Sequence, residues 1–321
     1  MAAWIYKGNV TQQPLVQREK KAWYIPFHRQ PKFIATPRDK DPHVLLQQLK
    51  PNDTIFCPYS RLRDFTTNFL PRLHIDIVLI TTPYAIKVYP DWVEPLARNI
   101  TQHAHVLAWF ATNIGNYTGG YQYHPKVHPF PLGLRAIVGP TPKRMPVPYY
   151  RKAFVDTYYN PPNKTTHLYA NALGQTNKQR RLIVPRPGPQ VEYTVFLKEL
   201  AASHYVFSPN GDHGDCHRHY EAIGMGAVPV THLDKYLYSH LREGNTVYNT
   251  TEFNMTRLAQ QLEIPAEPGN RNMVFEEFWM EYVEAIVGRP LWWWDVNANR
   301  RSLLVHFQNA TRTPPMLPRE T

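Results

Sequence analysis

Apolar runs that alternate with amphipathic segments organise the first part of the chain. Short apolar runs at residues 54–57, 75–80 and 105–110 predict buried strands. Amphipathic segments at residues 61–70 and 91–99 predict the helices that connect them. Strands that alternate with helices are typical of a parallel sheet, so the pattern favours the α/β class, with helices on both faces of the sheet.

The same alternation returns in the second half of the chain. Residues 166–170, 204–208 and 227–230 predict strands, and residues 191–203 and 216–225 predict helices. No internal repeat occurs at the period of a solenoid. The pattern therefore predicts a second α/β domain, and we expect two doubly wound, Rossmann-like domains that face each other across a cleft.

A proline-rich segment separates the two patterns. Residues 139–150 carry four prolines in twelve positions. Because proline restricts its own backbone and that of the residue before it, this segment is predicted to be a linker or an extended crossover. We expect an N-terminal domain at 1–140, a linker at 141–160 and a C-terminal domain at 161–285. Residues 286–321 are expected to cross back onto the N-terminal domain. In the terminal segment, the aromatic run at 291–295 would supply an apolar anchor.

The densest cluster of polar residues is NGDHGDCHRHYEAIGMGAVPV, at residues 210–230. Its histidines, aspartates and single cysteine raise the possibility of a metal site. Zinc needs three or four converging ligands, and His217 and His219, two residues apart, do not share a helix face. The spacing therefore disfavours a metal, and we expect neither a metal nor another cofactor.

A phosphate site fits the same segment better. The predicted strand ends at Ser208 and is followed by glycines and a helix, whose N-terminus favours an anion. Asp215 is placed to cap that helix. Arg218 in the first turn can bind a phosphate through two N–H groups, and Glu221, on the same face, can accept both hydroxyls of a ribose. An ordinary Arg–Glu surface pair is the alternative.

Residues 207–230 resemble the donor-binding signature of exostosin-like glycosyltransferases, some of which are short virus-encoded proteins. The matching residues are Ser208, Pro209, Gly211, Asp215, Arg218, Glu221, Ala222, Gly226 and Pro229. Residues 169–181 are similar to the strand, loop and arginine that face the diphosphate in that family. Residues 109–113 and 124–134 are similar to the end of its N-terminal domain.

The resemblance implies a metal-independent GT-B glycosyltransferase, a hexosyl- or pentosyltransferase of glycan biosynthesis. Its donor would be a nucleotide-sugar, usually a UDP-sugar such as UDP-xylose, and its acceptor a glycan hydroxyl. The expected donor-binding residues are Asn171, Arg180, Arg181, Ser208, Pro209, Asn210, Gly211, Asp215, Arg218 and Glu221. Arg218, with Arg180 or Arg181, would stabilise charge on the leaving diphosphate. For Arg180 and Arg181, solvated surface charge is the alternative.

Inverting transfer needs a general base, and a carboxylate after an N-terminal strand is the natural source. Asp64 is the first candidate and Asp91 the second, each with an ordinary surface or capping role as the alternative. Relatives often carry an acidic residue after the second strand, where this chain has Thr81-Thr-Pro-Tyr84. The departure leaves both the base and inversion itself open.

Aromatic side chains can stack on sugar rings, so aromatic residues of the N-terminal half are candidates to contact the acceptor. The candidates for contact with the acceptor are Tyr84, Trp109, Tyr117 and Tyr121. Packing in the core is the alternative for each of them.

The net charge and its distribution indicate which ligands and partners the protein favours. The net charge of +11 favours phosphorylated or polyanionic ligands. The basic residues are scattered and match no nucleic-acid-binding motif, so no nucleic-acid partner is expected. A catalytically inactive glycan- or nucleotide-binding protein of the same fold is the alternative to an enzyme.

Composition also bears on the compartment. Two cysteines cannot form a disulfide framework, the chain has no apolar run of about 18 residues, and residues 1–30 lack the apolar core of a leader peptide. These features predict a cytoplasmic protein without a membrane segment. Eight Asn-X-Thr triplets keep a Golgi or ER luminal domain, separated from its anchor, as the alternative.

Overall fold

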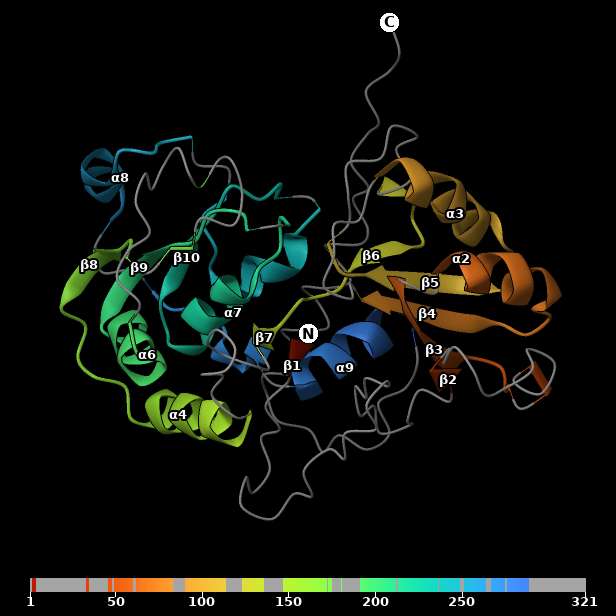
Figure 1. Ribbon diagram of the computed structural model, residues 1–321, viewed down its shortest axis with the longest axis horizontal. Helices are drawn as coiled ribbons and strands as arrows, with labels where there is room; N and C mark the ends of the chain where they lie inside the picture. Colours follow the sequence, from red (N-terminus) through yellow and green to blue (C-terminus); the bar gives the residue numbers. More distant parts are fainter. Residues whose placement is uncertain are drawn as a thin grey trace, which may run out of the picture. The chain divides into compact units, whose positions relative to one another are not determined.

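The computed structural model describes most of the residues between 46 and 288. The described residues are 2–3, 33–34, 46–47, 49–59, 62–82, 90–113, 123–135, 147–171, 173–174, 180, 191–211, 213–235, 237–248, 251–263, 267–274 and 276–288. The chain divides into two compact units (Figure 1). The five-stranded unit comprises Tyr6–Phe130 and Glu276–Thr321, and the three-stranded unit comprises Met1–Ile5 and Pro131–Phe275.

The five-stranded unit is built on a parallel sheet whose strands follow one another in chain order. They are β2 (Phe33–Ile34), β3 (Asp53–Pro58), β4 (Ile77–Thr82), β5 (Val106–Ala111) and β6 (Val127–Pro129). Ile77, Leu79 and Ile80 of β4 are wholly buried. Continuous apolar runs of this kind are typical of parallel strands covered on both faces. The strands predicted at 54–57, 75–80 and 105–110 are confirmed.

Helical segments connect these strands. Between β3 and β4 the chain forms α2 (Leu62–Asp64), a π-helical turn (Phe65–Phe69) and a 3₁₀ turn (Leu70–Arg72). Between β4 and β5 it forms α3 (Pro90–Gln102). Both helical predictions are confirmed in position. The first helical segment passes from α-helix to π-helix to 3₁₀-helix and ends at Arg72.

A helix from the far end of the chain completes this unit. In α9 (Glu276–Ile286), Tyr282 places its ring 5.9 Å from that of Phe110 in β5, at an interplanar angle of 75°. Trp279, also almost fully buried, lies 5.5 Å from Tyr282. The chain thus returns to the five-stranded unit at residue 276. The aromatic run at 291–295 lies outside the described residues.

The three-stranded unit holds a second parallel sheet, in the order β10 (Val228–Val230), β9 (Ser203–Phe207) and β8 (Thr166–Tyr169). Its helices include α6 (Tyr193–Ala201), α7 (His217–Gly224) and α8 (Met255–Gln261). A two-residue strand, β7 (Leu134–Arg135), pairs antiparallel with β1 (Ala2–Ala3). The elements predicted for this half of the chain are confirmed. The fold is therefore α/β with two parallel sheets, compatible with Rossmann-like units.

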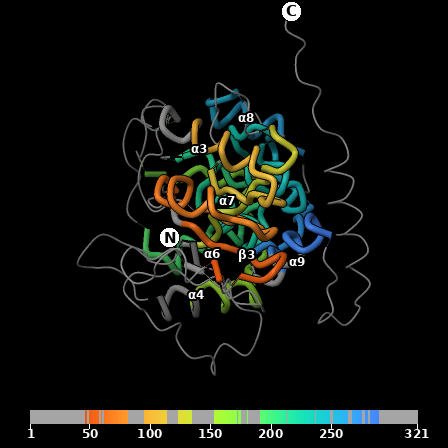
Figure 2. The backbone as a smooth tube through the Cα atoms, turned by 90° about the vertical axis from the view of Figure 1, so that its right-hand side faces the viewer, coloured from red at the N-terminus to blue at the C-terminus, as the bar shows by residue number. Residues whose placement is uncertain are grey.

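The proline-rich segment differs from its prediction. Residues 147–159, expected to be part of an extended linker, form α4 (Val147–Tyr159). Pro148 occupies the first helical turn, where a proline forfeits no intrahelical hydrogen bond. The helix packs against α6, its neighbour in both views (Figure 1 and Figure 2), and buries Phe154 completely. Residues 139–146 lie outside the described part of the chain.

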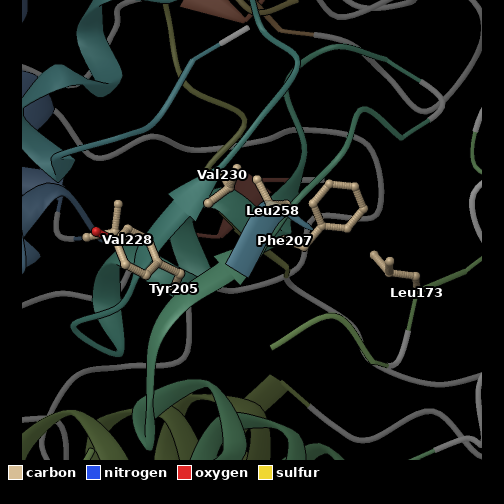
Figure 3. Close-up of a cluster of buried hydrophobic side chains, with 6 residues drawn as sticks. All are labelled: Leu173, Tyr205, Phe207, Val228, Val230 and Leu258. Carbon is tan, nitrogen blue, oxygen red and sulfur yellow. The ribbon is translucent and has the colours of Figure 1, made fainter. Parts of the chain in front are cut away.

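One face of the three-stranded sheet carries a compact apolar cluster. Alternate residues of β9 and β10 project to this face, and Leu258 of α8 packs against them (Figure 3). The members of the cluster are Leu173, Tyr205, Phe207, Val228, Val230 and Leu258. Because all three strands are parallel, their carboxyl ends meet at one edge, which we call the carboxyl edge. It comprises the residues that directly follow Tyr169, Phe207 and Val230.

Among the described helices, none is both long enough and apolar enough to cross a bilayer.

Candidate functional site

The N-terminus of α7 lies at the carboxyl edge, but its cap is not the one predicted. Cys216 is the N-cap residue, with φ −145° and ψ 155°. The carboxylate of Asp215, only 1% exposed, instead accepts hydrogen bonds from the Leu132 backbone N–H at 2.7 Å and the Tyr220 hydroxyl at 2.8 Å. The prediction that Asp215 caps the helix is therefore wrong, because its carboxylate accepts from Leu132, which is distant in sequence, and from Tyr220.

Two bonds tie the start of α7 to the segment that enters β7. Besides the bond from Leu132 to Asp215, His217 Nδ1 lies 2.7 Å from the carbonyl oxygen of Gly133. Burial raises the pKa of Asp215 to about 7, against the opposing effects of His219 and of the hydrogen bonds from Leu132 and Tyr220. The buried carboxyl therefore titrates near neutrality.

Asp215→Asn is expected to change how stability depends on pH. Between about pH 4, the ordinary aspartate pKa, and pH 7, the folded protein retains a proton that the unfolded chain releases. The free energy of unfolding of the wild type should therefore fall, relative to the variant, as pH rises through this window. Urea unfolding at several pH values measures the difference, with exposed Asp156→Asn as a matched control. Parallel profiles for the wild type and Asp215→Asn would contradict the expectation.

Arg218 lies across the carboxyl ends of two strands. Its Nε donates to the carbonyl of Phe207, the last residue of β9, at 3.0 Å, and its Nη2 donates to the carbonyl of Asn171, just beyond β8, at 2.9 Å. The guanidinium lies 5.3 Å from the ring centre of Tyr169 and 5.5 Å from that of Phe196. Burial lowers the pKa of Arg218 to about 10, so it remains a cation at neutral pH. A buried positive charge is thus fixed at this edge.

Glu221, one turn further along α7, is buried as well. Only 5% of it is exposed, against 7% for Arg218, and the Tyr193 hydroxyl donates to its Oε1 at 3.5 Å. The carboxylate favours the cationic form of Arg218. Since both residues are buried, the interpretation as an ordinary surface pair is wrong.

Arg180 holds the loop that follows β9. Its Nε donates to the carbonyl of Asn210 at 2.7 Å, its Nη2 donates to that of Pro209, and its side chain is buried. The alternative of solvated surface charge is therefore wrong for Arg180. Gly211, next in the loop, is buried too. Arg181 lies outside the described residues.

Ser208, a predicted donor-binding residue, forms a polar cluster with Cys216 and His219, which the sequence suggested only as possible metal ligands. His219 Nδ1 lies 2.8 Å from Ser208 Oγ, and His219 Nε2 lies 3.4 Å from Cys216 Sγ. Burial would raise the pKa of Cys216, but His219, Arg180 and Ser208 together outweigh burial and lower the pKa to about 6. The three-residue spacing of Cys216 and His219 on one helical turn was the available signal. Within the described ranges, no three His, Cys, Asp or Glu side chains converge as metal ligands.

The candidate general bases belong to the five-stranded unit. Asp64 ends α2, is exposed, and accepts a hydrogen bond from Asn68 Nδ2 at 2.7 Å through its Oδ1. Asp91 is the second residue of α3. Each follows the carboxyl end of a parallel strand, β3 for Asp64 and β4 for Asp91.

One candidate for acceptor contact is a core residue. Trp109 has no exposed surface, and its indole N–H donates to Thr81 Oγ1 at 2.8 Å. Such a side chain cannot stack on an external sugar, so this assignment is wrong. The strand β5 is buried on both faces at this point, so Trp109 lies in the core, where Thr81 satisfies its polar atom. The remaining candidates, Tyr84, Tyr117 and Tyr121, lie outside the described residues.

Comparison with known proteins adds little to this geometry. A scan against protein-family models finds no match, and a search of curated proteins finds none. Among solved structures, the crystal structure of the GtfA/B complex contains a similar chain, with 10% sequence identity and a TM-score of 0.29. The match covers 84% of this chain and 56% of the length of that chain. At this TM-score the likeness supports no conclusion about the fold or the function of this chain.

Proposed function

We propose that this protein is a glycosyltransferase that moves a sugar from a nucleotide-sugar, in particular a UDP-sugar, onto a glycan hydroxyl. The observation that carries the proposal is the position of Arg218, a buried cation that joins the carboxyl ends of β8 and β9. Open parallel sheets bind their ligands at this edge. The resemblance of residues 207–230 to a donor-binding signature supports the same site.

The residues at the edge have complementary tasks in this proposal. Arg218 and the N-terminus of α7 would attract the diphosphate, and Arg218 would stabilise the negative charge that grows as it leaves. Glu221 would accept hydrogen bonds from the ribose hydroxyls. Arg180 would act indirectly, because it holds the carbonyls of Pro209 and Asn210 in place.

The acceptor would bind to the five-stranded unit in a GT-B arrangement. Two α/β units with parallel sheets supply the parts for such an arrangement. Asp64, after β3, would remove the proton of the attacking acceptor hydroxyl while the configuration at the anomeric carbon of the sugar inverts. Asp91 is the second candidate for this base. Cations on the protein would perform the part that a divalent metal performs in other enzymes.

Binding of UDP without a divalent metal tests the donor site. UDP, or UDP-xylose, UDP-glucuronate or UDP-N-acetylglucosamine, is expected to bind the full chain in EDTA, because Arg218 supplies the positive charge. Calorimetry with and without manganese makes the measurement, and the variant Glu221→Gln provides a donor-site control with weaker binding. Binding that vanishes in EDTA and returns with manganese would overturn the metal-free site.

A nucleotide-binding protein without turnover is the second candidate. It is favoured by the environment of Asp64, which is exposed and already bonded to Asn68. It is also favoured by the threonines that end β4, where exostosin-like glycosyltransferases often carry an acidic residue. Release of UDP from a panel of UDP-sugars separates the two candidates. Tight binding of UDP with neither hydrolysis nor transfer would select this second function.

A further inference from the structure

Helix α6 presents one side to the Arg218 site. The residues on this side are three positions apart, the spacing of neighbours on a helix surface: Tyr193, Phe196 and Glu199. The ring centre of Phe196 lies 5.5 Å from the guanidinium carbon of Arg218. Glu199 contacts Tyr169 instead, whose hydroxyl donates to its Oε2 at 2.5 Å. The helix therefore supports the site through aromatic rings and a carboxylate.

Tyr169, the last residue of β8, packs its ring against the guanidinium of Arg218. The guanidinium carbon lies over this ring, 5.3 Å from its centre, and a cation is attracted to an aromatic face within about 6 Å. Only 4% of Tyr169 is exposed, and its ring centre lies 6.3 Å from that of Phe196. Because burial excludes water, this cation–π contact is stronger than one on the surface.

The ring complements the two hydrogen bonds that hold Arg218. The N–H groups that donate to the carbonyls of Phe207 and Asn171 lie in the plane of the guanidinium. Such bonds resist sliding of the group within its plane better than they resist tilting out of it. The ring of Tyr169 packs against the guanidinium and opposes the tilt. A phosphate accepts two N–H bonds only in the guanidinium plane, so the tilt decides how well the cation meets its ligand.

The hydroxyl of Tyr169 fixes the ring in turn. Burial and the hydrogen bond to Glu199 raise the pKa of Tyr169, against the opposing effect of Arg218, so the hydroxyl keeps its proton at neutral pH and donates. A hydrogen bond to a carboxylate is stronger than one between neutral groups. It also polarises the phenol, which makes the ring more attractive to a cation. The contacts thus run in sequence from Glu199 through Tyr169 to Arg218.

We propose that Tyr169 is the positioning residue for Arg218, that Glu199 anchors it, and that it speeds sugar transfer through Arg218 with no contact of its own to the donor. This inference rests on the proposed function and deepens it, because it assigns part of the rate to residues outside the segment 207–230. Arg218 meets more negative charge in the transition state than in the bound donor, so its orientation should affect the rate more than donor affinity.

The test is a double-mutant cycle on the full chain, by steady-state kinetics with a UDP-sugar. Tyr169→Leu removes the ring and should lower kcat by about 5–30-fold, the rate equivalent of a buried cation–π contact, with a smaller change in KM. Tyr169→Phe keeps the ring and should recover most of this loss. Arg218→Met has no cation for the ring to hold, so adding Tyr169→Leu to it should cause no further loss.

Tyr205 provides the matched control. It lies on the neighbouring strand β9, is 8% exposed, and donates its hydroxyl to the carbonyl of Glu263 at 2.8 Å. It belongs, however, to the apolar cluster that packs against α8 (Figure 3). Tyr205→Leu should lower Tm about as much as Tyr169→Leu and leave the kcat of the folded protein unchanged. Equal losses of kcat in the two variants would mean that Tyr169 has only a structural role.

A measurement without turnover separates this inference from the proposed function. In ¹⁵N spectra, the Nε–H of Arg218, identified by its absence from Arg218→Met, should exchange with water faster in Tyr169→Leu than in the wild type. If the wild type turns over no UDP-sugar, the proposed function falls, while faster exchange still supports the positioning of Arg218. If the wild type is active and Tyr169→Leu keeps its kcat or its exchange rate, or costs as much again in Arg218→Met, the inference alone is overturned.

Discussion

Arg218→Lys is expected to lower the rate of sugar transfer by about 10²–10³-fold, the loss typical of removing one preorganised donor from a developing negative charge. Lysine keeps the positive charge but lacks the planar fork that reaches the carbonyls of Phe207 and Asn171 together. The charge of the leaving diphosphate is greater in the transition state than in the bound donor, so the rate should suffer more than donor affinity. Steady-state kinetics with a UDP-sugar measures both quantities.

The matched control for this variant is Arg257→Lys, on the exposed face of α8. Thermal unfolding of both variants shows whether the replacement at Arg218 also disturbs the fold. A folded Arg218→Lys protein with the wild-type rate and donor affinity would remove Arg218 from the mechanism.

Asp64→Asn is expected to reduce transfer by about 10²–10⁴-fold, the usual contribution of positioned proton transfer. Asparagine retains the shape of the side chain and its bond to Asn68, but it cannot accept the acceptor's proton. Donor affinity should be nearly unchanged, because the donor residues belong to the other unit. Rates with a saturating acceptor and calorimetry with UDP separate the two effects.

Asp91→Asn is the comparison for the general base. A near-normal rate for Asp64→Asn together with a collapse for Asp91→Asn would move the base to the start of α3. Normal rates in both variants would place the base elsewhere or exclude simple inversion.

The elements predicted best are the strands in which consecutive residues are apolar and buried. Ile77, Leu79 and Ile80 are all buried because parallel strands are covered on both faces, and such runs are plain in a sequence. Helix α4 escaped prediction because Pro148, a helix breaker in most positions, lies in its first turn. The very short strand β2, Phe33–Ile34, offers too few residues for any periodicity.

The site was predictable to the extent that its chemistry is local. Arg218 and Glu221 lie one turn apart, and helical spacing alone brings them together. The role of Asp215 was not predictable, because its partner Leu132 is 83 residues away and donates through its backbone. The contact between the rings of Phe253 and His232 has the same difficulty, since the two residues meet only through tertiary packing.

The hydrogen bond between Leu132 and Asp215 determines which substitutions position 132 can accept during evolution. The group that Asp215 needs at position 132 is a main-chain N–H, which every amino acid except proline provides. Natural variants can therefore exchange the side chain at position 132 and keep the hydrogen bond to Asp215. Prolines do occur nearby, at Pro129 and Pro131. The constraint at this position is the absence of one residue type, because a proline there would remove the main-chain donor of the buried Asp215 Oδ2 and leave the bond from the Tyr220 hydroxyl.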